Sequence, residues 1–290
     1  MQGDTLSATI GTTPAARRGF AHALQALQAI VVREVLKFSQ QTGRLISALV
    51  RPLLWLAVFA AGFRNVFGVA IVEPYDTYVP YDVYIAPGLI GMVLLFNGMQ
   101  SSLAMVYDRE MGLMRLLLTA PLPRAWLLFC KLCATALLSV LQALAFVLVA
   151  LLIGTGLPIF SWTALHALVA LLAGALMLGA LGLLLSVHIK QLENFAGTMN
   201  FVIFPMYFLS TALYPLWKLQ ESGAEWVYQL ARFNPFTHAV EWIRFALYGK
   251  DPGLAPWVVL GCLLVFFVLA CWGYDPQRGF GGLTKRGGGA

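Results

Sequence analysis

Residues 163–187 read TALHALVALLAGALMLGALGLLLSV, an apolar run without a single Asp, Glu, Lys or Arg. A helix of this length matches the roughly 30 Å hydrocarbon core of a bilayer, which takes about 20 apolar residues to cross. The runs at 127–153 and 255–273 have the same character, apart from one lysine near the start of the first of them. Because backbone groups in lipid must be bonded internally, such runs predict membrane-spanning α-helices.

The composition of the whole chain agrees with this interpretation. Of its 290 residues, 60% are hydrophobic and 11% are charged, whereas a soluble domain carries about 25% charged residues. The charges are too few to cover a soluble enzyme, and an aromatic content of 13% argues against disorder. In a membrane protein the net charge of +6 reports basic cytoplasmic loops more often than nucleic-acid binding. We therefore expect no nucleic-acid partner.

We predict an all-α integral membrane protein with six transmembrane helices. Residues 1–44 form a cytoplasmic N-terminus, residues 45–273 the transmembrane domain and residues 274–290 a cytoplasmic tail. Arg51 and Arg64 lie near the two ends of the first helix, from which long side chains reach the membrane interface. The approximate spans are 45–66, 84–107, 127–153, 163–187, 196–217 and 255–273.

The distribution of basic residues predicts the orientation of these spans. Most Lys and Arg fall in the N-terminal segment, in residues 108–131, in residues 188–195 and in the C-terminal tail. Because basic loops face the cytoplasm, both termini are expected to be cytoplasmic. The expected location is the inner membrane of a bacterium.

Residues 20–40, before the first span, predict an amphipathic helix that lies in the membrane interface. Arg17 and Arg18 match the start of a twin-arginine export signal, but the regular apolar spacing favours an uncleaved helix. The apolar residues that recur at intervals of three or four are Phe20, Leu24, Leu27, Val31, Val35 and Phe38.

Two segments between spans are neither spans nor simple loops. Residues 110–118 predict a short helix that carries Glu110 and Arg115 away from its leucines, and it serves either as an interfacial connector or as a docking element for a cytoplasmic partner. Residues 218–257 predict short re-entrant or interfacial helices on the outer side, one of which begins at Asn234 and Pro235. This outer segment forms either a gate or a structural plug.

Several polar residues within the predicted spans are costly against lipid and are expected to face protein or a water-filled path. They are Asn97, Gln100, Gln142 and Asn200. Aromatic walls for such a path are available nearby. The candidate path-lining residues are Trp55, Phe59, Phe96, Asn97, Gln100, Phe204 and Tyr207.

The chain carries no motif for chemistry of its own. There is no phosphate-binding G-x-x-x-x-G-K-[ST] loop, no G-x-S-x-G and no H-E-x-x-H in the sequence. The four histidines are scattered and the four cysteines lie within apolar runs, so no metal, cofactor or catalytic site is expected. A transport function would take its energy from a partner.

Four motifs in the same order resemble those of the ABC-2 type permease family, the membrane subunits of ATP-binding-cassette exporters. The first two are IAPGLI at 85–90 and the segment 110–121, which ends in Thr-Ala-Pro. The other two are NFVIFPMYFLSTALYP at 200–215 and NPFTHAVEWIR at 234–244. Together with six spans, these motifs cover nearly the whole chain.

The resemblance implies a permease that is not itself an enzyme. Two such chains, as a homodimer or a related pair in membrane lipid, would join two separate ATPase subunits that bind ATP and Mg²⁺. Residues Glu110, Arg115 and Leu118 match the coupling helix that docks on the ATPase. The outer motif residues Asn234, Pro235 and Arg244 match residue by residue, with a structural role.

The substrate is left open by the sequence. The compact chain is similar to permeases for polysaccharides or lipo-oligosaccharides, and a drug or lipid exporter is the alternative. Two other classes are a non-transporting membrane assembly subunit and a membrane-embedded transferase, for which only Asp108 and Glu110 offer interfacial acids. Alternating access and a continuous channel are both compatible with the pattern of spans.

Overall fold

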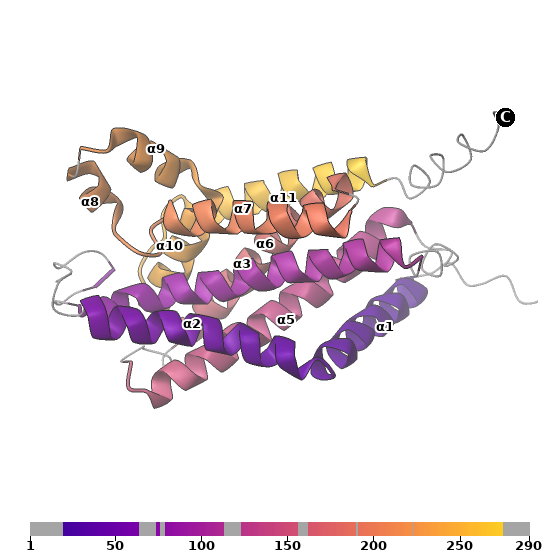
Figure 1. Ribbon diagram of the computed structural model, residues 1–290, viewed down its shortest axis with the longest axis horizontal. Coiled ribbons are helices and arrows are strands. Elements are labelled where there is room, and N and C mark those ends of the chain that lie inside the picture. Colours follow the sequence, from indigo (N-terminus) through magenta and orange to yellow (C-terminus); the bar gives the residue numbers. More distant parts are fainter. Residues whose placement is uncertain are drawn as a thin grey trace, which may run out of the picture.

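A computed structural model describes residues 20–63, 74–75, 79–112, 123–155, 162–189, 191–221 and 223–274. The described part is built from helices, as predicted (Figure 1). The helices are α1 (Phe20–Ser39), α2 (Thr42–Phe63), α3 (Tyr81–Glu110), α5 (Arg124–Leu152), α6 (Thr163–His188), α7 (Leu192–Phe208), α8 (Leu216–Glu221), α9 (Glu225–Phe233), α10 (Pro235–Leu247) and α11 (Ala255–Gly273).

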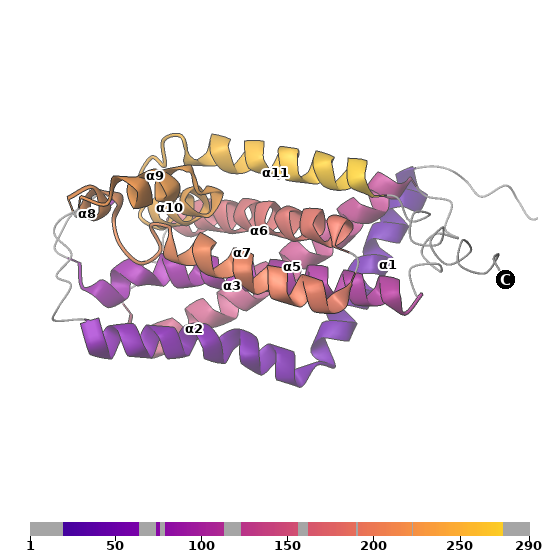
Figure 2. The ribbon, with the colours of Figure 1, turned by 45° about the horizontal axis from the view of Figure 1, so that its top comes forward.

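Four described helices, α3, α5, α6 and α11, are long and apolar enough to cross a membrane. These helices correspond to four of the predicted spans and make the chain a multi-pass membrane protein. Helix α2 has a shorter apolar part, Leu49–Phe59, and α7 has 17 residues. Both pack against α3 and run along the bundle (Figure 2). The count of six spans therefore stays a prediction, with which the arrangement agrees.

Two helices differ in length from the predicted spans. Helix α3 has 30 residues and extends beyond the predicted 84–107 at both ends. Glu110 is consequently the last residue of α3, and not the first residue of a separate short helix. Helix α7 ends at Phe208, well before the predicted residue 217. Arg64 lies outside the described residues.

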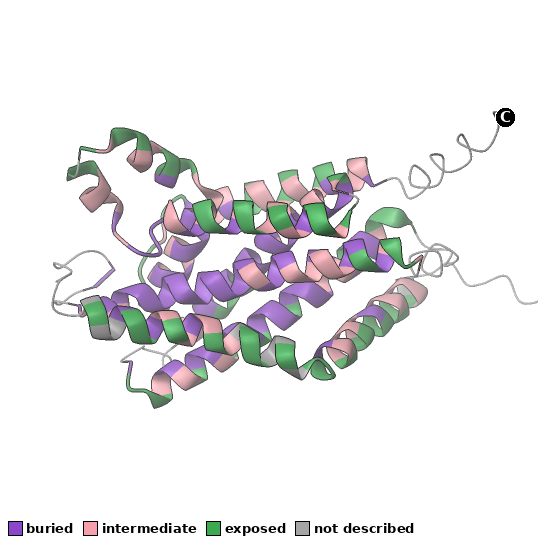
Figure 3. Cartoon of the chain, in the orientation of Figure 1, coloured by how far each residue is buried: buried purple, intermediate pink, exposed green. Residues whose placement is uncertain are grey.

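Helix α3 lies at the centre of the bundle, and most of its residues are buried (Figure 3). It packs against α2, α5, α6, α7 and α10. Helix α3 packs closely on α6, where a Cβ atom on Gly98 would lie 3.2 Å from the backbone nitrogen of Gly179. Small residues at this crossing allow the two backbones to pack closely, as is common between membrane helices.

Helix α1 packs obliquely on the start of α5 at one end of the bundle, here called the α1 end (Figure 1). Trp126 Nε1 donates a hydrogen bond to the carbonyl of Ala23 at 3.1 Å. The predicted apolar stripe is divided between two environments, because Phe38 is buried whereas Leu24 is 53% exposed. An exposed apolar side chain on an amphipathic helix agrees with a position at the lipid interface.

Three short helices connect α7 to α11 in the region where the sequence predicts short outer helices. Helices α8 and α9 lie at the opposite end of the bundle, here called the α9 end (Figure 2). Helix α10 packs against α3, α6 and α11 through a buried apolar stripe. The chain leaves α10 through Gly249, which adopts a positive φ of 66°. The buried stripe consists of Phe236, Val240, Ile243 and Leu247, which are spaced three or four residues apart.

Candidate functional site

Arg244 lies on α10 and is 2% exposed, although the sequence places it off the apolar stripe of that helix. Its guanidinium forms an ion pair with Glu241, one turn earlier. It also donates to the carbonyl of Thr211 at 2.8 Å. The ring of Tyr84 on α3 lies 4.2 Å from the guanidinium carbon. A buried charge requires such partners, so Arg244 joins α10 to α3 as a structural residue.

Asn234 and Pro235 begin α10 as predicted, with the Asn234 side chain accepting a hydrogen bond from the backbone N–H of Phe236. The amide nitrogen of Asn234 has a second role. It donates to the carbonyls of Met206 and Leu209, both at 2.7 Å. These carbonyls lie at the C-terminal end of α7. The side chain of Asn234 therefore caps both the end of α7 and the start of α10.

Aromatic side chains join α2 to α7 toward the α9 end. Trp55 stacks on Phe59 with a centroid distance of 5.2 Å and meets the edge of Phe208 at 6.3 Å. Phe208 in turn stacks on Phe204. Phe204 is 47% exposed, whereas the predicted path residue Tyr207 is 1% exposed. The structure thus brings most of the predicted aromatic residues together but places Tyr207 in the core.

The polar residues of α3 and α5 meet in a chain of hydrogen bonds inside the bundle. Gln142 donates to Asn97 at 3.2 Å, and Asn97 donates to Ser139 at 2.7 Å. The hydroxyl groups of Ser101 and Thr135 lie 2.6 Å apart, one turn toward the α1 end. Asn97 is 2% exposed, so in the single chain this predicted path residue bridges two helices. Such bonds satisfy polar groups that lipid would leave unpaired.

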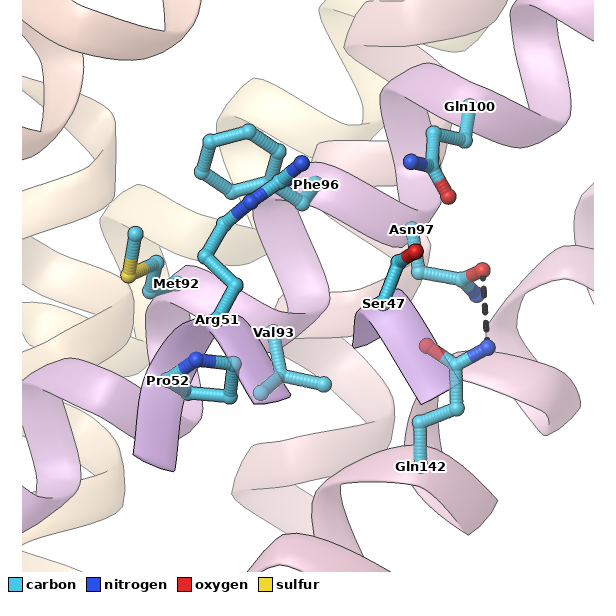
Figure 4. A pocket seen from close by; sticks show the side chains of 9 residues that line it. All are labelled: Ser47, Arg51, Pro52, Met92, Val93, Phe96, Asn97, Gln100 and Gln142. Carbon is cyan, nitrogen blue, oxygen red and sulfur yellow. Dashed lines mark hydrogen bonds between the residues drawn. The ribbon is translucent and has the colours of Figure 1, made fainter. Parts of the chain in front are cut away.

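Beside Asn97, a small cup opens on the surface between α2 and α3 (Figure 4). Arg51 extends across it, with its guanidinium carbon 4.0 Å from the centre of the Phe96 ring. The sequence predicts that Arg51 reaches the membrane interface, but the structure places it against the middle of α3. The cup volume is about 10 Å³. Its lining consists of Ser47, Arg51, Pro52, Met92, Val93, Phe96, Asn97, Gln100 and Gln142.

At the α1 end of α3, Asp108 forms ion pairs with three cations from two other helices. Lys37 and Arg33 on α1 approach its carboxylate at 3.2 and 3.6 Å. Lys131 on α5 approaches at 3.7 Å, and the Asp108 side chain is 6% exposed. A buried carboxylate that is shared in this way fixes α1 and α5 against α3. The sequence identifies the acid but not the cations that surround it.

The last two residues of α3 hold two more helices. Arg109 donates a hydrogen bond to the carbonyl of Ser186 near the end of α6. Glu110 accepts a hydrogen bond from the backbone N–H of Leu192 at 2.9 Å. A carboxylate in this position caps the start of α7 and complements its dipole. Of the other predicted coupling residues, Arg115 and Leu118 lie outside the described residues.

Within the described ranges, no cluster of His, Cys, Asp and Glu side chains is suited to hold a metal ion. The cysteines Cys130, Cys133, Cys262 and Cys271 are free thiols in apolar surroundings. Cys130 is buried as a small core residue, whereas the other three are partly exposed. The arrangement therefore offers polar and aromatic contacts along α2, α3 and α7 more than it offers a reactive group.

The sequence was compared with models of known protein families, and the result agrees with this order of apolar helices and with the helix that starts at Asn234-Pro235. A model of the ABC-2 type transporter family matches residues 25–248. The chain belongs to this family. The match extends from α1 through α10 and includes Arg51, Asp108 and Arg244.

Relatives of this ABC-2 type chain carry a matching description. A protein of Porphyra purpurea is 31% identical over 232 residues, which cover 79% of this chain and 76% of the relative. A protein of Cyanophora paradoxa is 31% identical over 237 residues, which cover 80% and 77% of the two chains. Both are named "Putative transport permease ycf38". The chain is thus similar to transport permeases over most of its length.

Proposed function

We propose that this ABC-2 type chain is the permease subunit of an ATP-binding-cassette exporter, and that a path follows its α2–α3–α7 face. The supporting observation is the contact of Trp55 on α2 with Phe208 on α7, which aligns the two helices. Residues four apart on a helix share a face, so Arg51 and Ser47 lie on the face of α2 that carries Trp55, and Phe204 and Asn200 lie on the face of α7 that carries Phe208.

Ser47 and Arg51 of α2 line the same cup as Gln100 of α3, and Asn200 lies on α7, which also packs against α3. We call Ser47, Arg51, Gln100 and Asn200 the polar row. Ser47 and Asn200 are exposed, whereas Arg51 and Gln100 are half-buried. Polar groups at this depth are costly against lipid and are better placed against water or a second chain.

Helix α11 presents a different surface on another side of the bundle. Its sequence contains no charged residue, Asn or Gln. Leu264 is 65% exposed and Trp272 86% exposed, which suits contact with lipid. This contrast supports a path along the polar row, between two permease chains.

In the proposed assembly, two copies of a separate ATPase subunit bind ATP and Mg²⁺ and face the α1 end, where both termini lie in the cytoplasm of a bacterium. The segment with Glu110, Arg115 and Leu118 would dock on the ATPase. Because Glu110 also caps α7, movement of this segment would reach a helix of the path directly. The chain itself performs no catalysis.

The proposed substrate is a polysaccharide, a lipo-oligosaccharide or another amphipathic compound. A drug or lipid exporter is the alternative within the same mechanism. An assembly subunit that does not transport is the alternative of another class. The exposed Asn200 and the half-buried Gln100 favour transport, because an anchoring subunit has no need for polar groups on a membrane surface.

The first test is an affinity purification from detergent-solubilised membranes, followed by an ATPase assay of the purified material. A stoichiometric partner with vanadate-sensitive ATPase activity is expected. A stable oligomer of this chain without a nucleotide-binding partner, from membranes that express the neighbouring genes, would instead support the assembly subunit.

The second test is the variant Glu110→Ala, which should reduce transport more than ATP hydrolysis while leaving membrane insertion intact. The matched control is Glu225→Ala, because Glu225 is an exposed acid on α9 that bonds Gln229 on its own helix. Equal transport by wild type and Glu110→Ala would contradict the coupling role of Glu110.

A further inference from the structure

Arg51 differs from Arg244 and Lys131, two other cations inside the described bundle. Arg244 has Glu241 as its counter-ion, and Lys131 has Asp108. Arg51 forms no hydrogen bond or ion pair with any residue in the described ranges, and the Phe96 ring is its one recorded contact. A guanidinium has five N–H donors, so its hydrogen-bonding capacity is unused by the part of the chain that the structure describes.

The position of Arg51 makes this unused capacity unusual. Phe96 lies near the middle of the 30-residue helix α3, about 21 Å from either end at a rise of 1.5 Å per residue. A side chain stacked on Phe96 is therefore near the middle of the longest helix of the described bundle. Ionisable residues at this depth are costly and mark pairs or transport paths.

The polar residues that line the cup around Arg51 carry no negative charge. The cup contains the amides of Asn97, Gln100 and Gln142 and the hydroxyl of Ser47, but no carboxylate (Figure 4). Gln100 makes no hydrogen bond with the described residues, so its amide is available together with the guanidinium. Because the cup holds about 10 Å³, a bound group would sit at its open mouth, along the polar row.

We propose that Arg51 and Gln100 form a binding site for the anionic oxygen group, a phosphate or a carboxylate, of an amphipathic molecule that this permease transports. A guanidinium binds such oxyanions through paired N–H donors, and a neighbouring amide adds a third. The guanidinium lies over the ring of Phe96, which supports it through a cation–π contact beside the cup. This inference rests on the proposed path along the α2–α3–α7 face.

The test measures binding of radiolabelled dodecyl phosphate to the full chain, with any subunit that co-purifies, in nanodiscs of dioleoylphosphatidylcholine. Dodecanol is the neutral probe with the same alkyl chain. Wild type should bind dodecyl phosphate more tightly than dodecanol. Arg51→Gln should weaken dodecyl phosphate binding by about tenfold or more, the usual worth of a charged hydrogen bond, and leave dodecanol unchanged.

Two further variants keep the test specific. Arg51→Lys retains the charge without the planar donor pair and should retain part of the affinity. Arg232→Gln removes the same charge from an exposed position on α9 and should bind as wild type does. If inorganic phosphate displaces dodecyl phosphate, the site recognises the oxyanion alone. If inorganic phosphate does not displace it, the site requires an oxyanion that is attached to an alkyl chain.

Three results would overturn the inference. The first is unchanged dodecyl phosphate binding in Arg51→Gln. The second is an equal loss of binding in Arg232→Gln, which would indicate general charge attraction. The third is dissociation of the purified oligomer by Arg51→Gln, which would make Arg51 an interface residue. The binding assay uses no ATP, so the absence of an ATPase partner would refute the proposed function without altering the binding result.

Discussion

Arg244 and Arg51 each stack on an aromatic ring of α3, at 4.2 Å and 4.0 Å, yet their surroundings differ. Arg244 is 2% exposed and has Glu241 and the Thr211 carbonyl as partners. Arg51 is half-buried beside an open cup without an acid. An aromatic support is therefore common to both sites, and the polar partners separate an arginine that the fold requires from one that remains available to a ligand.

The largest effect on stability is expected for Arg244→Leu. The substitution leaves the Glu241 carboxylate and the Thr211 carbonyl without their donor, and breaking such a buried pair costs about 3–5 kcal/mol. Thermal unfolding and the folded yield from size-exclusion chromatography measure this loss. Arg232→Leu on the exposed surface of α9 is the control and should unfold as wild type does.

The next effect compares the two faces of the bundle directly. Leu264→Lys places a charge on the lipid-exposed side of α11, which costs about 2.5–3.5 kcal/mol near the middle of a membrane helix. Asn200→Lys places the same charge in the polar row and should cost less. Membrane yield of the two variants measures the difference. Equal yields would remove the distinction between the lipid face and the polar row.

A moderate effect is expected for Asp108→Asn, which removes the carboxylate that Lys37 on α1 and Lys131 on α5 share. The loss of a charged hydrogen bond of this kind costs about 1.5–3 kcal/mol. Hydrogen exchange of residues 20–39 should become faster because α1 loses a contact with α3. Asp251→Asn, on an exposed loop, should leave that exchange unchanged.

The smallest effect on stability is expected for Arg51→Gln. The substitution leaves no described acid unpaired, and the lost contact with Phe96 is offset by removal of a charge from the membrane interior. The free energy of unfolding should change by less than about 1 kcal/mol, a typical value for a site outside the core. Denaturation as severe as that of Arg244→Leu would instead make Arg51 part of the folded core.

Local patterns in the sequence predict some elements closely. The asparagine and proline at 234–235 specify the start of α10, because capping and a fixed φ act within one turn. The apolar run at 255–273 coincides with α11 (Ala255–Gly273). The length of a helix that faces lipid is set by the number of consecutive apolar residues in its own sequence.

Other features depend on contacts between distant residues, which no local pattern contains. The depth of Arg51 follows from the position of α2 along α3, and α2 alone does not specify that position. The burial of Arg244 depends on Thr211 and Tyr84, which are far away in sequence. The end of α7 depends on the amide of Asn234, so hydropathy extends the predicted span past Phe208.

Both ends of α7 are held by side chains from other parts of the bundle. Glu110 holds its first turn at 2.9 Å from the N–H of Leu192, and Asn234 holds its last carbonyls. Between these two contacts α7 is about 26 Å long, because its 17 residues rise by 1.5 Å each. In the proposed mechanism, a displacement of the end of α3 would therefore move α7 and reach the start of α10 through these hydrogen bonds.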